Sequence, residues 1–290
     1  MLAIPPLSAE TIITVAHFPV TNAYINSTLV MIGFVIFGFV INKLAKAFYY
    51  RGEAPRGVLN FFESLLELMF KYLDQVTGDR KKSIRFLPIV GGLFFFILIS
   101  NWIGLLPGIG SIGIYQLHEG HIELIPFFRP ANTDLNMTLS MAVLAVVASH
   151  VFGIVTIGFF KYANKFIKLG DIWHAVKSRK PVSILTAVVE FFVGIIEIFS
   201  EIAKMVSLSL RLFGNIFAGE VLLTVLASLI AFIVPLPFMA LELLVGLIQA
   251  TVFSMLTLVY LTMATAEIHA HGDNESHEVD ALHTEALVHN

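Results

Sequence analysis

The chain has 290 residues, of which 57% are hydrophobic and only 13% are charged, and its mean hydropathy is +0.84. Soluble domains carry about 25% charged residues, so this composition argues against a soluble fold. The net charge of −3 gives no indication of a nucleic-acid partner, and the lack of cysteine excludes disulfides, thiolate nucleophiles and cysteine metal sites.

The apolar runs predict an all-α integral membrane protein with five membrane-embedded helices and one amphipathic surface helix. In chain order, the expected membrane helices cover residues 24–48, 84–106, 134–160, 182–234 and 238–266. Segment 55–78 mixes Phe and Leu with Glu, Lys and Asp at helical spacing, so we expect it to lie on the membrane surface. The membrane domain therefore covers residues 24–267.

The two ends of the chain are expected to lie outside this domain. Residues 1–23 have no basic stretch before an apolar one, so they are interpreted as an outer N-terminal segment rather than a signal peptide. Residues 268–290 are rich in histidine and acidic residues, and we expect a disordered cytoplasmic tail.

Lysine and arginine are concentrated in two connecting segments. Nine of the 18 lie between Lys43 and Arg85 and six lie between Lys161 and Lys180, whereas none precedes Lys43. Cytoplasmic loops carry the excess of basic residues, so both segments are expected in the cytoplasm and the N-terminus outside. Five crossings then leave the C-terminus in the cytoplasm.

The segment 182–234 has no internal proline and is bracketed by Pro181 and Pro235. A continuous helix of this length would be roughly 80 Å long, whereas the hydrocarbon core is about 30 Å thick. We therefore expect it to tilt strongly, to bend near Gly214 or Gly219, or both. The last helix should lean beside it, forming a long tilted hairpin.

Four charged residues of this segment repeat every seven positions: Glu190, Glu197, Lys204 and Arg211. Each step of seven slips by only about 20° on a straight helix, so the four form one slowly drifting stripe. Asn215 stays on the stripe, Glu201 flanks it and Glu220 faces elsewhere. Ionisable groups at membrane depth are costly and usually line a pathway or a polar interface.

Other polar residues have more than one interpretation. Snorkelling toward the surface would also explain Glu190, Glu197 and Lys204. Arg211 has apolar neighbours on both sides, so it either serves a pathway or forms a buried ion pair with Glu220 or Glu242. His150 either lines a channel or is a structural histidine of the third span.

The run SLSLRLFGNIFAGE, Ser207–Glu220, resembles the signature of subunit a of bacterial F-type ATP synthases. Three further runs resemble segments of that family: FLPIVGGLFFFILISNWIGLLPG (86–108), ANTDLNMTLSMA (131–142) and LIQATVFSMLTLVYLTMA (247–264). The resemblance covers about residues 20–267. The order of these four runs along the chain and the expected topology agree with the family.

The resemblance implies a stator subunit of the ATP synthase membrane sector in a bacterial inner membrane. Its partners would be the c-ring, the peripheral stalk b subunits, lipid and transported protons, in preference to sodium. Two half-channels would carry protons to and from the c-ring carboxylates and so couple ion flow to rotation. Arg211 would be the essential arginine facing these carboxylates, because its guanidinium stays charged when buried.

The resemblance also assigns a proton path. Asn215, Glu220, Glu242 and Gln249 would belong to the outer half-channel or to the contact beside Arg211, and Glu197 to the inner route. Secondary candidates are Glu190, Glu201, Lys204, Asp134 and His150. Many bacterial relatives pair a carboxylate at the Glu220 position with a histidine at the Glu242 position, and this chain departs from that pattern.

The distance between Glu220 and Glu242 depends on where the hairpin turns. A turn centred near residue 236 would offset them by about 15 Å along straight helices, although tilt or bending could shorten this distance. If they are close, we expect them to titrate as a coupled pair that holds one proton.

Two rival functions belong to other classes. A secondary transporter would also place charges at mid-membrane, but such proteins usually show internal repeats or broken helices, and neither is found in the sequence. An intramembrane hydrolase needs a nucleophile with a base or a metal site, but no HExxH or GxSxG motif is present. No cofactor or metal site is predicted.

Overall fold

The computed structural model describes residues 9–15, 18–51, 57–106, 112–118, 121–167, 181–230 and 234–266. Five of its helices are long and apolar enough to cross a membrane, which confirms the predicted number. They are α1 (Asn22–Arg51), α3 (Arg80–Gly104), α4 (Leu135–Ile157), α7 (Pro181–Leu229) and α8 (Pro235–Thr265). The expected cytoplasmic tail, 268–290, lies outside the described residues.

The amphipathic segment forms α2 (Val58–Thr77), which packs against α3. Its buried side chains, Leu59, Met69 and Leu73, occupy one face, while its acidic and basic side chains lie on the other faces. Gly78 ends the helix in the left-handed conformation, with φ of 66°, which glycine adopts without strain. Asp79 then caps α3 by accepting a hydrogen bond from the backbone N–H of Lys81.

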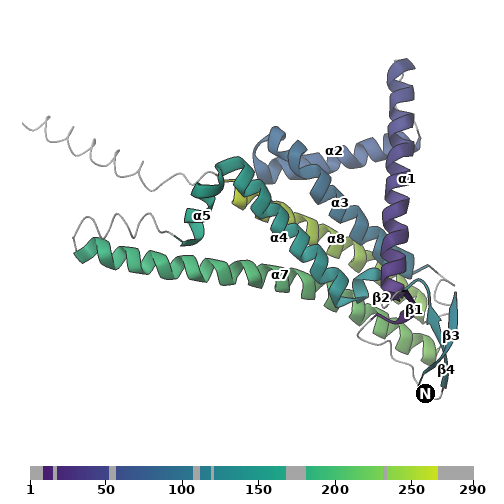
Figure 1. Cartoon of the computed structure of the whole chain (residues 1–290). Helices are drawn as coiled ribbons and strands as arrows, with labels where there is room; N and C mark the ends of the chain where they lie inside the picture. Colours follow the sequence, from purple (N-terminus) through teal and green to yellow (C-terminus); the bar gives the residue numbers. More distant parts are fainter. Residues whose placement is uncertain are drawn as a thin grey trace, which may run out of the picture.

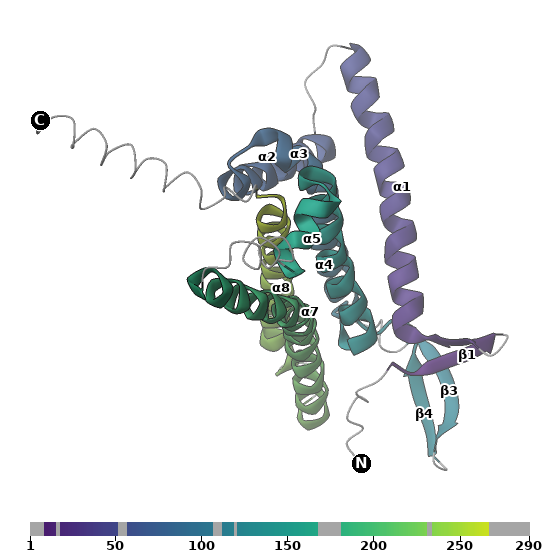
Figure 2. The same cartoon turned by 60° about the vertical axis from the view of Figure 1, so that its left-hand side comes forward.

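Two antiparallel hairpins, which the sequence did not predict, lie at the opposite end of the molecule from α2 (Figures 1 and 2). β1 (Thr11–Val15) pairs with β2 (Phe18–Thr21) just before α1. β3 (Gly113–His118) pairs with β4 (His121–Pro126) between α3 and α4. Each hairpin lies in a segment that was expected outside the membrane helices, so the chain is helical in its spans and has small sheets beyond them.

The third expected span, 134–160, is shorter in the structure than predicted. α4 ends at Ile157, because Gly158 has φ of 95° and breaks the helical path. The chain continues as α5 (Phe159–Ile167), which packs back against α4 and α7. A side chain at Gly153 would run into Tyr162 of α5 and would lie 2.8 Å from the carbonyl oxygen of Ala264, so this glycine permits close packing of α4, α5 and α8.

The core lies where α3, α4, α7 and α8 meet. Small residues let these helices approach closely, including Ala142 and Ala145 of α4 and Ala250 of α8, which are fully buried. A Cβ atom at Gly246 of α8 would lie 3.3 Å from the Cβ of Asn101 on α3. A second cluster, around Leu73, Phe86 and Leu261, holds α2 onto α3 and α8.

α7 is an unbroken helix of 49 residues, about 74 Å long at the usual rise. It runs across the other helices and is strongly inclined to α1 (Figures 1 and 2). Leu208, Leu212 and Ile216 of its C-terminal half are buried against the core, whereas most side chains of its N-terminal half are exposed.

The hairpin between α7 and α8 turns earlier than the sequence suggested. α7 ends at Leu229 and α8 begins at Pro235, which occupies the first turn of that helix. Proline suits this position, since it has no N–H to leave unpaired. Glu242 packs on Gly219, the residue before Glu220, so the two glutamates lie closer along the helices than the 15 Å that straight helices and a turn near residue 236 would give.

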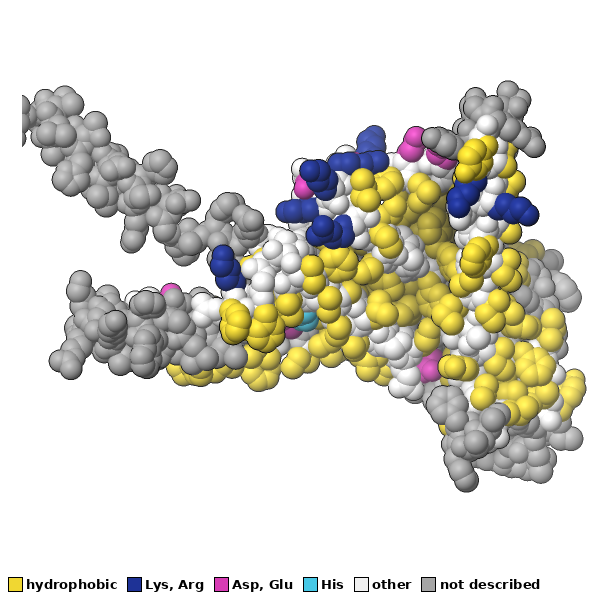
Figure 3. Space-filling model, turned by 45° about the horizontal axis from the view of Figure 1, so that its top comes forward, with side chains coloured by type: hydrophobic (Ala, Val, Ile, Leu, Met, Phe, Trp, Pro, Cys, Tyr) yellow, Lys and Arg dark blue, Asp and Glu magenta, His cyan; other side chains and the backbone are white. Residues whose placement is uncertain are grey.

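Basic side chains gather at one end of the molecule, over α2 and the neighbouring ends of α1 and α3, while apolar side chains are spread over the other described parts of the view (Figure 3). Many large apolar side chains on α1, α4 and α7 are exposed. This distribution is typical of a protein whose helices contact lipid or partner helices.

Candidate functional site

Arg211 lies on the outward face of α7. Leu208, Leu212 and Ile216 point into the core, and Arg211 is exposed beside Gly214 and Asn215, which are exposed too. Among the described residues, no side chain forms a hydrogen bond or ion pair with Arg211. Arg211 is therefore accessible to a neighbouring helix, and its charge also acts on Tyr260 of α8.

A cavity of about 280 Å³ lies on the hairpin side of Arg211, between the loop after β4 and helices α3, α7 and α8. We call it the Glu242 cavity. Its polar lining residues are Asn101, Arg129, Glu220, Thr224 and Glu242. Glu220 is nine residues beyond Arg211 on α7, or about 14 Å along the helix.

Within this cavity Arg129 binds Glu220. The Nε atom lies 2.8 Å from Oε1 and 3.1 Å from Oε2, and an Nη atom lies 2.9 Å from Oε2. Arg129 is only 3% exposed and Glu220 is 20% exposed. The ion pair is therefore bidentate and largely shielded from solvent. Glu220 was one alternative partner for Arg211, and it binds a different arginine.

Glu242 enters the same cavity from α8 and packs directly on α7. A side chain at Gly219 would run into its carboxylate, so the glycine makes room for it. The Oε1 atom of Glu242 is buried and has no hydrogen-bond partner among the described residues, and the same is true of Nδ2 of Asn101. The two glutamates thus share one cavity, but only one of them is held by a cation.

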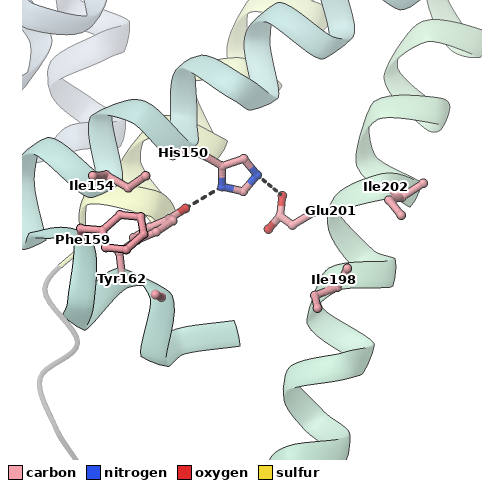
Figure 4. Close-up of a pocket in the computed structure, with 8 residues that line it drawn as sticks. His150, Ile154, Phe159, Tyr162, Ile198, Glu201 and Ile202 are labelled. Carbon is pink, nitrogen blue, oxygen red and sulfur yellow. Dashed lines mark hydrogen bonds and ion pairs between the residues drawn. The ribbon is translucent and has the colours of Figure 1, made fainter. Parts of the chain in front are cut away.

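A second cavity, of about 360 Å³, lies on the other side of Arg211, between α4, α5 and α7 (Figure 4). We call it the His150 cavity. His150 of α4 points between Tyr162 of α5 and Glu201 of α7 (Figure 4). Nδ1 of His150 lies 2.7 Å from the Tyr162 hydroxyl, and Nε2 lies 3.8 Å from a Glu201 oxygen.

Glu201 also accepts a hydrogen bond from Lys204, with the nitrogen and oxygen 2.7 Å apart. The Lys204 ammonium lies 5.4 Å from the centre of the Tyr260 ring, so α8 contributes to the same polar group. Glu201 is ten residues before Arg211, or about 15 Å along α7.

Burial raises the pKa of Tyr162 to about 12, and the charges of Glu201 and Glu197 add to the rise. The hydroxyl therefore keeps its proton at neutral pH and can donate it to Nδ1 of a neutral His150 ring. In that tautomer the Nε2 hydrogen points toward Glu201. The structure thus joins His150 to Tyr162 and Glu201, whereas the sequence left open whether His150 lines a channel or is structural and gave no indication of Tyr162.

The other candidates are distributed unevenly. Asn215 is exposed one turn from Arg211, and Gln249 is half-buried on α8 outside both cavities. Glu197 acts electrostatically on Tyr162 and so lies near the His150 cavity. Glu190 is half-buried farther toward the start of α7 and lines neither cavity.

Asp134 has a clear structural role. Its side chain accepts a hydrogen bond of 3.0 Å from the backbone N–H of Asn136 and caps the N-terminus of α4. It is absent from the lining of both cavities.

Sequence reasoning missed Arg129 as a site residue, although it is the one basic residue of the segment 107–133. That isolation is the signal that could have identified it, since every other connecting basic residue lies in a cluster. Within the described ranges, no group of three or more His, Cys, Asp or Glu side chains is arranged to hold a metal ion.

Comparison with known proteins identifies the family. The family model described as ATP synthase A chain matches residues 24–262. ATP synthase subunit a of Syntrophobacter fumaroxidans is 34% identical over 218 residues, 75% of this chain and 74% of the relative. The Geobacter sulfurreducens protein is 31% identical over 241 residues (83% and 86%), and that of Mycobacterium ulcerans is 34% identical over 230 residues (76% and 81%). On this match over most of its length, the chain belongs to the subunit a family of ATP synthases.

Proposed function

We propose that the Glu242 cavity and the His150 cavity are the two half-channels of this chain, and that Arg211 separates them. As a member of the subunit a family, the chain is a stator subunit of the membrane sector, is multi-pass and takes part in proton translocation. The single observation that carries the finer proposal is the order along α7: a cavity lined by Glu220, then the exposed Arg211, then a mainly apolar cavity that contains Glu201 and His150.

The partner on the Arg211 face is a ring of c subunits, each with one carboxylate at mid-membrane. Gly214, one turn from Arg211, has no neighbouring atom within contact distance of a Cβ, so a helix could approach this face closely. A guanidinium stays protonated when buried, so it can hold an ionised rotor carboxylate and block a direct leak between the cavities.

Each cavity would exchange protons with one side of the membrane. Water entering the Glu242 cavity would satisfy the buried Oε1 of Glu242 and Nδ2 of Asn101, which need partners. In the His150 cavity, Glu201 and His150 supply groups that can bind and release a proton. Glu197 belongs to the same side, and Asn215 and Gln249 to the contact beside the rotor.

The orientation follows from charge. The basic end, around α2, faces the cytoplasm, and the hairpins face outward, so the Glu242 cavity opens outside and the His150 cavity inside. Like its bacterial relatives, the chain would then lie in a plasma membrane, with its N-terminus outside and its C-terminus in the cytoplasm. The peripheral stalk b subunits would bind other exposed apolar faces and keep the chain from rotating with the ring.

Replacement of Arg211 tests this function. In membrane vesicles holding the assembled complex, Arg211→Ala should abolish both gradient-driven ATP synthesis and ATP-driven proton pumping while assembly is retained. Arg211→Lys should also fail, since a compact ammonium lacks the planar fork of the guanidinium.

Arg85→Ala is the matched control, because Arg85 is an exposed arginine of α3 that lines neither cavity. It should keep synthesis and pumping. If Arg211→Ala vesicles still coupled ATP hydrolysis to proton pumping, the assignment of Arg211 would be wrong.

A further inference from the structure

Arg129 is a buried cation that comes from outside the long helix hairpin. It lies between β4 and α4, and it is 3% exposed. An arginine at this burial is strongly destabilising unless it is paired and hydrogen-bonded. Here both oxygens of Glu220 satisfy it, across 91 residues of sequence, with the three contacts given above.

The backbone that carries Arg129 is fixed on several sides. Nδ2 of Asn26, a fully buried residue of α1, donates a hydrogen bond of 2.8 Å to the Arg129 carbonyl oxygen. Pro130 follows, and its ring packs so closely on Gly104 of α3 that a side chain there could not fit. The short helix η2 (Ala131–Thr133), buried throughout, then leads into α4. The guanidinium is therefore presented from a rigid support.

The Arg129–Glu220 ion pair, which we call the Arg129 clamp, gives the two glutamates of the cavity different surroundings. Both carboxylate oxygens of Glu220 are bound by Arg129, so the Glu220 side chain is held in a fixed orientation. Glu242, packed against Gly219 in the same cavity, has a buried oxygen with no partner among the described residues. Arg129, Glu220 and Glu242 are the charged residues that line this cavity.

We propose that Arg129 is a positioning residue that holds Glu220 as a fixed wall of the Glu242 cavity, so that Glu242 is the carboxylate that takes up and releases the transported proton. The proposal rests on the proposed half-channel. It replaces the expectation of two glutamates that share one proton, because Glu220 already has a partner that occupies both of its oxygens. The Arg129–Glu220 pair also ties the loop after β4 to α7 and so keeps the cavity in shape.

The test uses four variants of the assembled complex in membrane vesicles: Arg129→Gln, Glu220→Gln, the combined change and Glu242→Gln. Each single change of the ion pair leaves a buried charge unpaired beside Glu242, so passive proton flux and ATP-driven pumping should fall by about tenfold or more. The combined change leaves two neutral side chains that can hydrogen-bond, so it should recover most of the lost flux. Glu242→Gln should stop proton flux by itself and also in the combined variant.

Two outcomes would overturn the inference. A combined variant no more active than Glu220→Gln alone would mean that Glu220 itself carries the proton. Normal proton flux in the Glu242→Gln variant would mean that Glu242 does not carry the transported proton. The content of this subunit in the vesicles is measured in each variant. Should Arg129→Gln fail to assemble, the exchange Arg129→Glu with Glu220→Arg keeps an ion pair, and its loss of all flux despite assembly would count against the clamp.

The same assays separate this inference from the half-channel function. Arg211→Ala serves as the reference in every experiment. If Arg211→Ala is inactive and the combined variant is not rescued, only the role of Arg129 is wrong. If Arg211→Ala pumps normally, the proposed function itself fails.

Discussion

The Glu242 cavity and the His150 cavity each contain a glutamate of α7 bound to a cation, but the two cations reach the helix differently. Glu220 is bound by Arg129, which comes from a loop 91 residues away and is nearly inaccessible. Glu201 is bound by Lys204, three residues along the same helix, with both side chains partly exposed. The first pair fixes one element against another, whereas the second moves with α7 as a unit.

The difference has energetic consequences. A local pair between partly exposed side chains stabilises a helix by less than about 1 kcal/mol. Breaking a buried pair by removal of one partner costs about 3–5 kcal/mol, because the remaining charge is left without water or a partner. We therefore expect the Glu242 cavity to respond strongly to single substitutions and the His150 cavity to respond weakly.

Apart from Arg211 and the charged residues of the Glu242 cavity, the largest effect is expected at Gly219. Gly219→Ala places a methyl group where the Glu242 carboxylate lies, and the flexible end of Glu242 must move. Because catalytic groups lose much of their effect when displaced by about 1 Å, proton-driven ATP synthesis should fall by about tenfold.

Gly92→Ala is the control for this change. Gly92 lies on α3 with open space around its Cβ position, so the same substitution should leave synthesis unchanged. Equal activities of the two variants in vesicles with equal subunit content would show that the position of Glu242 does not matter.

A smaller effect is expected in the His150 cavity. Glu201→Gln removes the partner of Lys204 and the charge that faces Nε2 of His150, while the hydrogen-bonding shape is kept. For a partly exposed pair we expect ATP-driven pumping to fall by about two- to fivefold.

Glu190→Gln offers the comparison on the same helix, since Glu190 lines neither cavity and should leave pumping unchanged. A larger loss for Glu190→Gln than for Glu201→Gln would move the inner route toward the start of α7 and away from His150.

The parts of this molecule that depend on neighbouring residues could be predicted from the sequence. Long apolar runs gave the five spans, and the polar pattern of 58–77 gave the surface helix, because both depend on helical periodicity alone. The long α7 also follows from the uninterrupted helical spacing, whereas the spacing left open whether Arg211 is exposed or paired. Even the pair of Glu201 with Lys204 lies at the i, i+3 spacing of a helix surface.

The parts of the molecule that depend on contacts between residues far apart in the sequence could not be predicted. Nothing near Glu220 in the sequence indicates Arg129, since loop closure between β4 and α4 brings the two together. The start of α8 was misplaced because proline is equally suited to follow one helix or to begin the next, and here Pro235 begins α8. The bend at Gly158, which shortens the third span, depends in the same way on the packing of Tyr162 against Gly153.

The most direct test of the central claim is the side from which each cavity can be reached. The chain has no cysteine, so single cysteines at Thr224, in the Glu242 cavity, and at Ile202, in the His150 cavity, can be labelled with a small membrane-impermeant thiol reagent. In the assembled complex, with right-side-out and inverted vesicles compared, Thr224→Cys should react from the outer side and Ile202→Cys from the cytoplasmic side. Reaction of both cysteines from the same side would contradict two half-channels separated at Arg211.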